Sequence, residues 1–95
     1  MHYLYILYSA SSDKYYVGQT PDLETRLLFH NELSEDSYTS KHRPWELVCS
    51  IEVPSRSEAM KLERYVKGRK SRRYIESLVK EEKARRRLLS RFGLR

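Results

Sequence analysis

The fold is decided by residues 3–31, which open with the run Tyr3-Leu4-Tyr5-Ile6-Leu7-Tyr8. Every side chain in this run is aromatic or aliphatic, so both faces of the strand that it forms need cover. The polar residues 9–14 are typical of a turn, and the β-favouring residues 15–18 predict a second strand that pairs with the first as a hairpin. Gly18 is expected to end that strand, where the backbone turns sharply or another group approaches it closely.

A helix is predicted to follow the hairpin, from Pro21 to about Asn31, with Thr20 as its N-cap. Leu23 and Leu27 stand four residues apart and give this helix a narrow apolar stripe that can pack on the sheet.

Ionisable side chains interrupt the apolar faces of two predicted helices. Arg26 and His30 border the stripe of the first helix, where they either extend to solvent at the sheet edge or belong to a site. Glu63 follows Leu62 on the apolar stripe of the second helix. A carboxylate is costly there without a cation, so Glu63 either pairs with an arginine such as Arg26 or binds a metal ion.

The middle of the chain predicts a polar loop over residues 32–44, with one helical turn around Leu33. A third, mostly apolar strand is predicted from Trp45 to Val53, and Cys49 within it is expected in the core.

The last third of the chain predicts helices. Ser55 and Glu58 form a capping box for a helix that ends at Gly68, and Ser71 can cap the next helix. The basic residues 80–91 are predicted to be helical, either as a continuation of that helix or as a separate one.

These elements predict an α+β fold, a three-stranded, mostly antiparallel sheet flanked by helices in the order β-β-α-β-α-α. At 95 residues the chain is expected to form one domain, with residues 1–80 as its main part and residues 81–95 as a basic helical extension.

Charge is distributed unevenly along the chain. Residues 1–60 hold 5 Lys/Arg and 9 Asp/Glu, whereas residues 61–95 hold 14 and 4. This asymmetry favours a polyanionic partner such as nucleic acid, although a solvated basic helix face would produce the same pattern. The side chains expected to contact phosphates are Lys41, Arg43, Lys67, Arg69, Lys70, Arg72 and Arg73.

Composition also limits the class of protein. No apolar run is long enough to span a membrane, and the N-terminus lacks the charged-then-apolar order of a signal peptide. The single cysteine excludes an internal disulfide, so we expect a cytoplasmic protein in a reducing compartment. Nothing in the pattern indicates an obligate protein partner.

Tyr3-Leu4-Tyr5, followed after ten residues by Tyr16-Val17-Gly18, resembles the two-part signature of the GIY-YIG nuclease superfamily. The resemblance covers roughly residues 2–80 and is to the small stand-alone bacterial subfamily related to the excision-repair incision subunit. It extends over several further segments, namely Gln19-Thr20-Pro21-Asp22-Leu23, Arg26, His30-Asn31, residues 40–48, Ser57-Glu58-Ala59 through Glu63, and residues 67–72.

The resemblance implies metal-dependent hydrolysis of a DNA phosphodiester with one divalent cation, Mg²⁺ or Mn²⁺. By position, Tyr16 would be the general base, Tyr5 would support it, Arg26 would neutralise the phosphate, and Glu63 would hold the metal. His30 remains a rival base, because the usual pKa of imidazole, about 6.5, suits proton transfer better than that of a phenol.

Two departures from the signature bear on activity. Tyr3-Leu4-Tyr5 replaces Gly-Ile-Tyr but keeps the reactive Tyr5, and Gln19 stands where several active relatives carry a lysine. The prediction is a DNA endonuclease of repair or processing, and the sequence leaves open whether its substrate is branched, single-stranded, damaged or intact duplex DNA. The alternative is a binding module that keeps the nuclease fold and has little turnover.

Overall fold

Three strands form one antiparallel sheet, with the first strand in the middle. The computed structural model describes residues 1–33 and 38–94. The sheet order is β2-β1-β3, and the strands are β1 (His2–Ser9), β2 (Lys14–Thr20) and β3 (Glu46–Val53). The predicted antiparallel sheet and its hairpin are confirmed.

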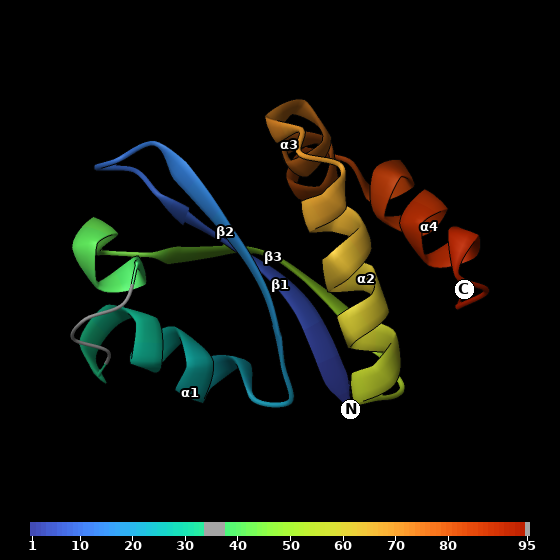
Figure 1. Cartoon of the computed structure of the whole chain (residues 1–95), viewed down its shortest axis with the longest axis horizontal. Helices are drawn as coiled ribbons and strands as arrows, with labels where there is room; N and C mark the ends of the chain where they lie inside the picture. Colours follow the sequence, from blue (N-terminus) through green and yellow to red (C-terminus); the bar gives the residue numbers. More distant parts are fainter. Residues whose placement is uncertain (34–37, 95) are drawn as a thin grey trace.

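The helices lie on both sides of this sheet (Figure 1). On one side are α1 (Leu23–Leu28) and the π-helical turn η1 (Phe29–Leu33), followed by the 3₁₀ turn η2 (Thr39–His42). On the other side are α2 (Arg56–Gly68), α3 (Arg72–Lys80) and α4 (Glu82–Arg91). The predicted α+β class is correct, and the observed order is β-β-α-β-α-α-α.

The central strand β1 supplies side chains to two cores. Leu4 and Ile6 pack in the larger core, beneath α2, α3 and α4, where Ala84 and Leu88 of α4 are also buried. Tyr5 and Leu7 alternate with them and face α1. Both faces of β1 are therefore covered, as its unbroken apolar run predicts.

Gly18 lies inside β2, directly opposite Tyr5, and does not end the strand as expected. The Tyr5 ring crosses this glycine, and a Cβ atom at position 18 would lie 2.6 Å from Tyr5 Cζ. The close approach expected for Gly18 is thus present, but it comes from a side chain of the neighbouring strand.

The start of the first helix differs from the prediction. Thr20 is the last residue of β2, and its Oγ1 accepts a hydrogen bond from the Asp22 backbone N–H at 3.1 Å. The N-cap is Asp22, whose carboxylate accepts from the Thr25 N–H at 3.2 Å. The α-helix then ends at Leu28 and continues as the π-helical turn, which buries His30.

Short-range contacts define where the helices on the other side of the sheet begin and end. Ser55 and Ser71 cap α2 and α3 as predicted, each accepting from the N–H three residues on. The open question about residues 80–91 is settled at Glu81, whose extended backbone separates α3 from α4. Arg85 then donates to the Leu78 carbonyl at 2.6 Å at the end of α3.

Three remaining predictions concern Cys49, the loop at 32–44 and membrane spans. Cys49 is a buried free cysteine of β3, as expected. In the predicted loop at 32–44, the helical turn expected around Leu33 is present as the end of η1, a further turn, η2, forms at Thr39–His42, and residues 34–37 lie outside the described part of the chain. Within residues 1–33 and 38–94, no helix has the length and apolar character that a membrane crossing requires.

Candidate active site

The α1 face of the sheet contains a buried string of polar side chains. Tyr5 and His30 are each 2% exposed, and the Tyr5 hydroxyl lies 3.0 Å from Nε2 of His30. The other ring nitrogen, Nδ1, lies 2.9 Å from Oγ1 of the buried Thr39. Both nitrogens of His30 are thus occupied, one by β1 and the other by the 3₁₀ turn.

Burial sets the protonation of this string. Desolvation, followed by repulsion from Arg26 and Arg43, lowers the pKa of His30 to about 4. Desolvation also raises the pKa of Tyr5 to about 12, although a hydrogen bond from Arg26 opposes the rise. At neutral pH both side chains are therefore uncharged, and His30 can accept a hydrogen bond on one nitrogen while it donates from the other.

Tyr16 of β2 lies beside this string and is half-buried. Its ring centroid is 4.8 Å from that of His30 and 6.3 Å from that of Tyr5. Nζ of Lys67, from α2, is 5.7 Å from the centre of the Tyr16 ring. The two signature tyrosines are therefore on one face of the hairpin, as expected, and a lysine accompanies the more accessible one.

Arg26 and Gln19 each bury a polar atom that has no hydrogen-bond partner among residues 1–33 and 38–94. These atoms are Nε of Arg26 and Oε1 of Gln19, and both residues line one surface cavity of about 370 Å³ together with His2 and Arg56. The Arg26 guanidinium also lies 4.6 Å from the Phe29 ring centre. An unsatisfied buried donor on a cation is a feature that an anionic ligand can satisfy.

Glu63 reaches this region from α2. Its side chain is 23% exposed and accepts a hydrogen bond from Lys67 Nζ at 2.7 Å, one turn further along the helix. The expected partner Arg26 is thus replaced by a lysine on the same helix. The charge of Glu63 also contributes to the raised pKa of Tyr5, which places the carboxylate within electrostatic reach of the tyrosine.

The donor set of this region suits a hard divalent cation. Glu63 is a single, partly exposed carboxylate, and Mg²⁺ usually binds through one or two carboxylates while it keeps several waters. Among residues 1–33 and 38–94, no three His, Cys, Asp or Glu side chains gather as a potential metal site. Glu63 fits Mg²⁺ or Mn²⁺ once Lys67 moves off its carboxylate.

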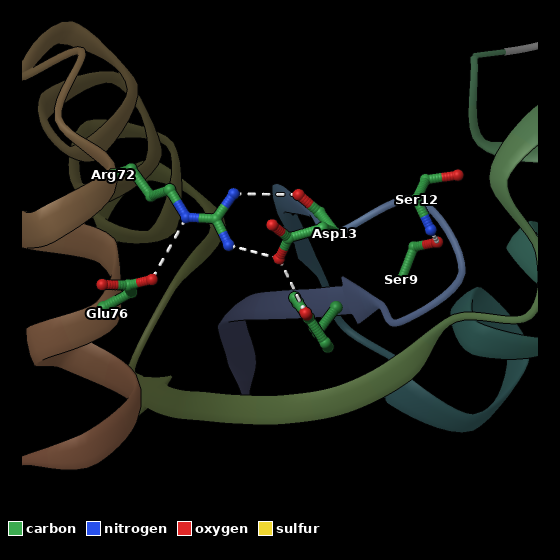
Figure 2. A network of polar contacts seen from close by, with 6 residues as sticks. Ser9, Ser12, Asp13, Arg72 and Glu76 are labelled. Carbon is green, nitrogen blue, oxygen red and sulfur yellow. Dashed lines mark hydrogen bonds and ion pairs between the residues drawn. The ribbon is translucent and has the colours of Figure 1, made fainter.

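The side chains expected to contact phosphates have different surroundings. Arg72 is bound to Oδ1 of Asp13 at 2.5 Å and to Oε2 of Glu76 at 3.1 Å, so its charge is already balanced (Figure 2). Arg43 donates from Nε to the His30 carbonyl at 2.7 Å. Lys41, Lys70 and Arg73 are exposed.

Two residues of the site were not identified from the sequence. Thr39 stands nine positions after His30 in the sequence, so no spacing rule indicated their hydrogen bond. Asn31 accepts from the Trp45 N–H at 2.6 Å and donates to the Trp45 carbonyl at 3.0 Å. These two bonds fix the start of β3 against the π-helical turn that contains His30. In the sequence, the only indication of this role was that the polar residue Asn31 follows His30 directly.

Residues 1–76 match the family described as the GIY-YIG catalytic domain. The chain belongs to this family. The geometry agrees with the signature, because the close contact of Tyr5 with Gly18 joins the two halves of the motif and leaves Tyr16 beside them.

The relatives of similar length are UPF0213 proteins. A UPF0213 protein of Streptococcus pneumoniae is 36% identical over 90 residues, covering 95% of this chain and 88% of the relative. The UPF0213 protein BH0048 of Halalkalibacterium halodurans is 38% identical over 78 residues, covering 82% and 81%. Its solution NMR structure matches with a TM-score of 0.53 at 37% identity, covering 85% of this chain and 84% of that one.

A match of a different kind is to the structure-specific endonuclease subunit SLX1 of Cryptococcus neoformans. It is 42% identical over 58 residues, which cover 58% of this chain and 12% of SLX1. The similarity is therefore confined to a small part of that larger protein.

Proposed function

We propose that this protein is a metal-dependent endonuclease that hydrolyses phosphodiester bonds of DNA. The observation that carries the proposal is the meeting of five side chains from β1, β2, α1, α2 and the turn after α1, namely Tyr5, Tyr16, Arg26, Glu63 and His30. Membership of the GIY-YIG catalytic domain family and the partial match to a structure-specific endonuclease subunit support it.

The structure favours Tyr16 over His30 as the group that accepts a proton from water. Both ring nitrogens of His30 already face Tyr5 and Thr39, and the ring is 2% exposed. Tyr16 is half-buried, so part of its side chain is accessible to water, and Nζ of Lys67 lies 5.7 Å from the centre of its ring. In this proposal His30 and Thr39 fix the position of Tyr5, and Tyr5 supports Tyr16.

Arg26 and Glu63 provide the electrostatic part of the mechanism. Arg26 would bind the phosphate, satisfying its buried Nε and stabilising the charge that builds up in the transition state. Glu63 would hold Mg²⁺ or Mn²⁺, which supplies Lewis-acid stabilisation of that charge when bound. Lys67, released from Glu63, would turn to the DNA backbone.

One observation favours the alternative of a binding module with little turnover. The carboxylate proposed to hold the metal is already neutralised by Lys67 at 2.7 Å. A stable pair would weaken the metal site while leaving the basic surface free to bind DNA. This alternative predicts DNA binding that weakens steeply with salt and does not change in Glu63→Gln.

The test is cleavage of labelled single-stranded, duplex and branched DNA, with Mg²⁺, Mn²⁺ or EDTA. Cutting by the wild type should require metal, fall to background in Glu63→Gln, and fall about a hundredfold or more in Tyr16→Phe. Glu76→Gln and Tyr15→Phe are matched controls, because Glu76 lies on α3 and Tyr15 faces the opposite side of β2. Cutting that survives in Glu63→Gln and Tyr16→Phe would overturn the assignment of these residues.

The cellular setting is a proposal of the same kind. A role in DNA repair or processing, a relation to the excision-repair incision subunit, and action in the cytoplasm rest on the resemblance and on the composition. The division into residues 1–80 and a basic extension 81–95 is likewise a proposal, and truncation after residue 80 would test it.

A further inference from the structure

A second cavity lies between α2, α3 and α4, away from the candidate active site. Its volume is about 350 Å³, within the range of small-molecule sites. Ala84 and Leu88 contribute apolar surface to its lining. The aromatic and charged side chains of the lining are two tyrosines and three arginines, Tyr65, Tyr74, Arg69, Arg87 and Arg91.

The aromatic side chains of this cavity form a packed group. Tyr65 meets Tyr74 edge-on, with ring centroids 6.3 Å apart, and meets Phe92 in the same way at 5.6 Å. Both tyrosines are half-buried, so part of each side chain remains accessible. Such rings offer flat surfaces on which an aromatic ligand can stack.

Two of the three arginines, Arg69 and Arg91, lie against these rings. The Arg69 guanidinium lies 4.3 Å from the centre of the Tyr74 ring and donates to the Tyr65 hydroxyl at 2.9 Å. The Arg91 guanidinium lies 4.7 Å from the centre of the Tyr65 ring. Stacking on rings restricts a guanidinium without consuming all five of its N–H donors, so it remains able to bind an anion.

No carboxylate balances these three arginines within the described residues. The ion pairs found in residues 1–33 and 38–94 involve Lys67, Arg72 and Arg86, and no Asp or Glu lines the cavity. Arg69, Arg87 and Arg91 are also exposed at the cavity rim. Burial raises the pKa of Tyr74, while the charges of Arg69, Arg91 and Arg87 all oppose the rise, so the three cations act on one place.

The cavity and the candidate active site lie on opposite flanks of α2. Successive helical residues are about 100° apart, so Glu63 and Lys67 project on one side of the buried stripe Leu62–Val66. Tyr65 and Arg69 project on the other side. The cavity also depends on α4, which follows the part of the chain that matches the GIY-YIG catalytic domain.

We propose that this cavity binds one nucleotide unit, with its base stacked on the tyrosines and its phosphate bound by the arginines. A phosphate matches the guanidinium fork, and an aromatic base explains why the cations are arranged around rings. The nucleotide is either free in solution or part of a nucleic-acid strand. The proposal does not depend on the catalytic one, because the cavity contains none of the five side chains that carry it, although Arg69 is among the side chains expected to contact phosphates.

The test is an NMR titration of the full-length, isotope-labelled protein without divalent metal. The probes are AMP, adenosine, inorganic phosphate and a 5′-phosphorylated tetranucleotide, and the reporters are the backbone amides of Tyr74 and Leu88, with Glu63 as a reference for the other flank. AMP or the tetranucleotide should shift the amide resonances of Tyr74 and Leu88. Adenosine and inorganic phosphate should each bind at least about tenfold more weakly than AMP.

Variants decide whether the cavity is responsible. Arg87→Gln and Arg91→Gln should each weaken binding about tenfold, whereas Arg86→Gln, an exposed arginine of α4 paired with Glu82, should not. Binding of AMP identifies a free nucleotide as a sufficient ligand, and binding of the tetranucleotide alone identifies a strand. The proposal is overturned if neither probe shifts Tyr74 and Leu88, or if Arg86→Gln weakens binding as much as the cavity variants do.

Discussion

The two flanks of α2 use similar residue types in opposite ways. On the flank of Glu63, tyrosine and histidine side chains are linked by a hydrogen bond in a buried string, and a lysine pairs with the carboxylate. On the flank of Tyr65, tyrosines carry stacked arginines that no carboxylate of the described residues balances. The first arrangement keeps Tyr5 and His30 uncharged at neutral pH, and the second leaves positive charge available.

The largest expected effect tests whether the two flanks of α2 act independently of each other. Arg26→Gln should lower DNA cleavage about a hundredfold to a thousandfold, because it removes the cation proposed to stabilise the transition state. The same variant should leave AMP binding in the cavity unchanged. Steady-state cleavage and the NMR titration measure the two effects, with Arg64→Gln, an exposed arginine of α2, as control. A loss of both properties in Arg26→Gln would mean that the flanks are coupled.

The buried string should make stability depend on pH. The folded pKa of His30 is about 4 and the unfolded value about 6.5, so between these pH values the unfolded chain binds a proton that the folded chain excludes. The contribution of His30 to stability is therefore complete above about pH 6.5 and falls by about 3 kcal/mol as the pH drops to about 4.

Urea unfolding at several pH values measures this dependence in the wild type and in His30→Gln. In the variant, the free energy of unfolding should depend less on pH between pH 4 and 6.5 than in the wild type, whatever its value at pH 7. Equal slopes in the two proteins would show that the His30 pKa is not depressed in the folded state.

Two glycines offer a smaller, stability-based contrast. Gly18→Ala should destabilise the protein by about 1–3 kcal/mol, because its Cβ would lie 2.6 Å from Tyr5 Cζ in a packed face. Gly68→Ala, at the end of α2, meets no atom within 4 Å and should be neutral or slightly stabilising. Thermal unfolding compares them, and an equal loss in both would contradict the close packing at Gly18.

The smallest effect is expected at the contact between the hairpin turn and α3. Asp13 holds Arg72 through both its backbone carbonyl and its carboxylate (Figure 2), but both side chains are exposed and screened by water. Asp13→Asn keeps a residue that tolerates the positive φ of 54° and removes the charge. We expect a barely measurable fall in Tm, smaller still at high salt. A large fall would mean that this contact holds α3 in place.

Local sequence chemistry predicted much of the fold. The hairpin followed from two β-favouring runs around a polar turn, and Ser55 and Ser71 were identified as caps because capping depends on side chains within three residues. The same reasoning failed at Thr20, since a second acceptor, Asp22, stood two residues on and took the cap. At Gly18 it predicted the close approach of another group but wrongly ended the strand there, because the approaching group is the Tyr5 ring of the neighbouring strand and β2 continues to Thr20.

The sequence by itself determined which residues could do chemistry, and the tertiary structure decided how they are combined. Tyr5, Tyr16, Arg26, His30 and Glu63 were identified from their types and order. That Glu63 pairs with Lys67, that both nitrogens of His30 are occupied, and that three arginines meet two tyrosines between α2, α3 and α4 came only from the fold. The physical reason is that a local pattern fixes the face on which a side chain lies, whereas its partner is set by how separate elements pack together.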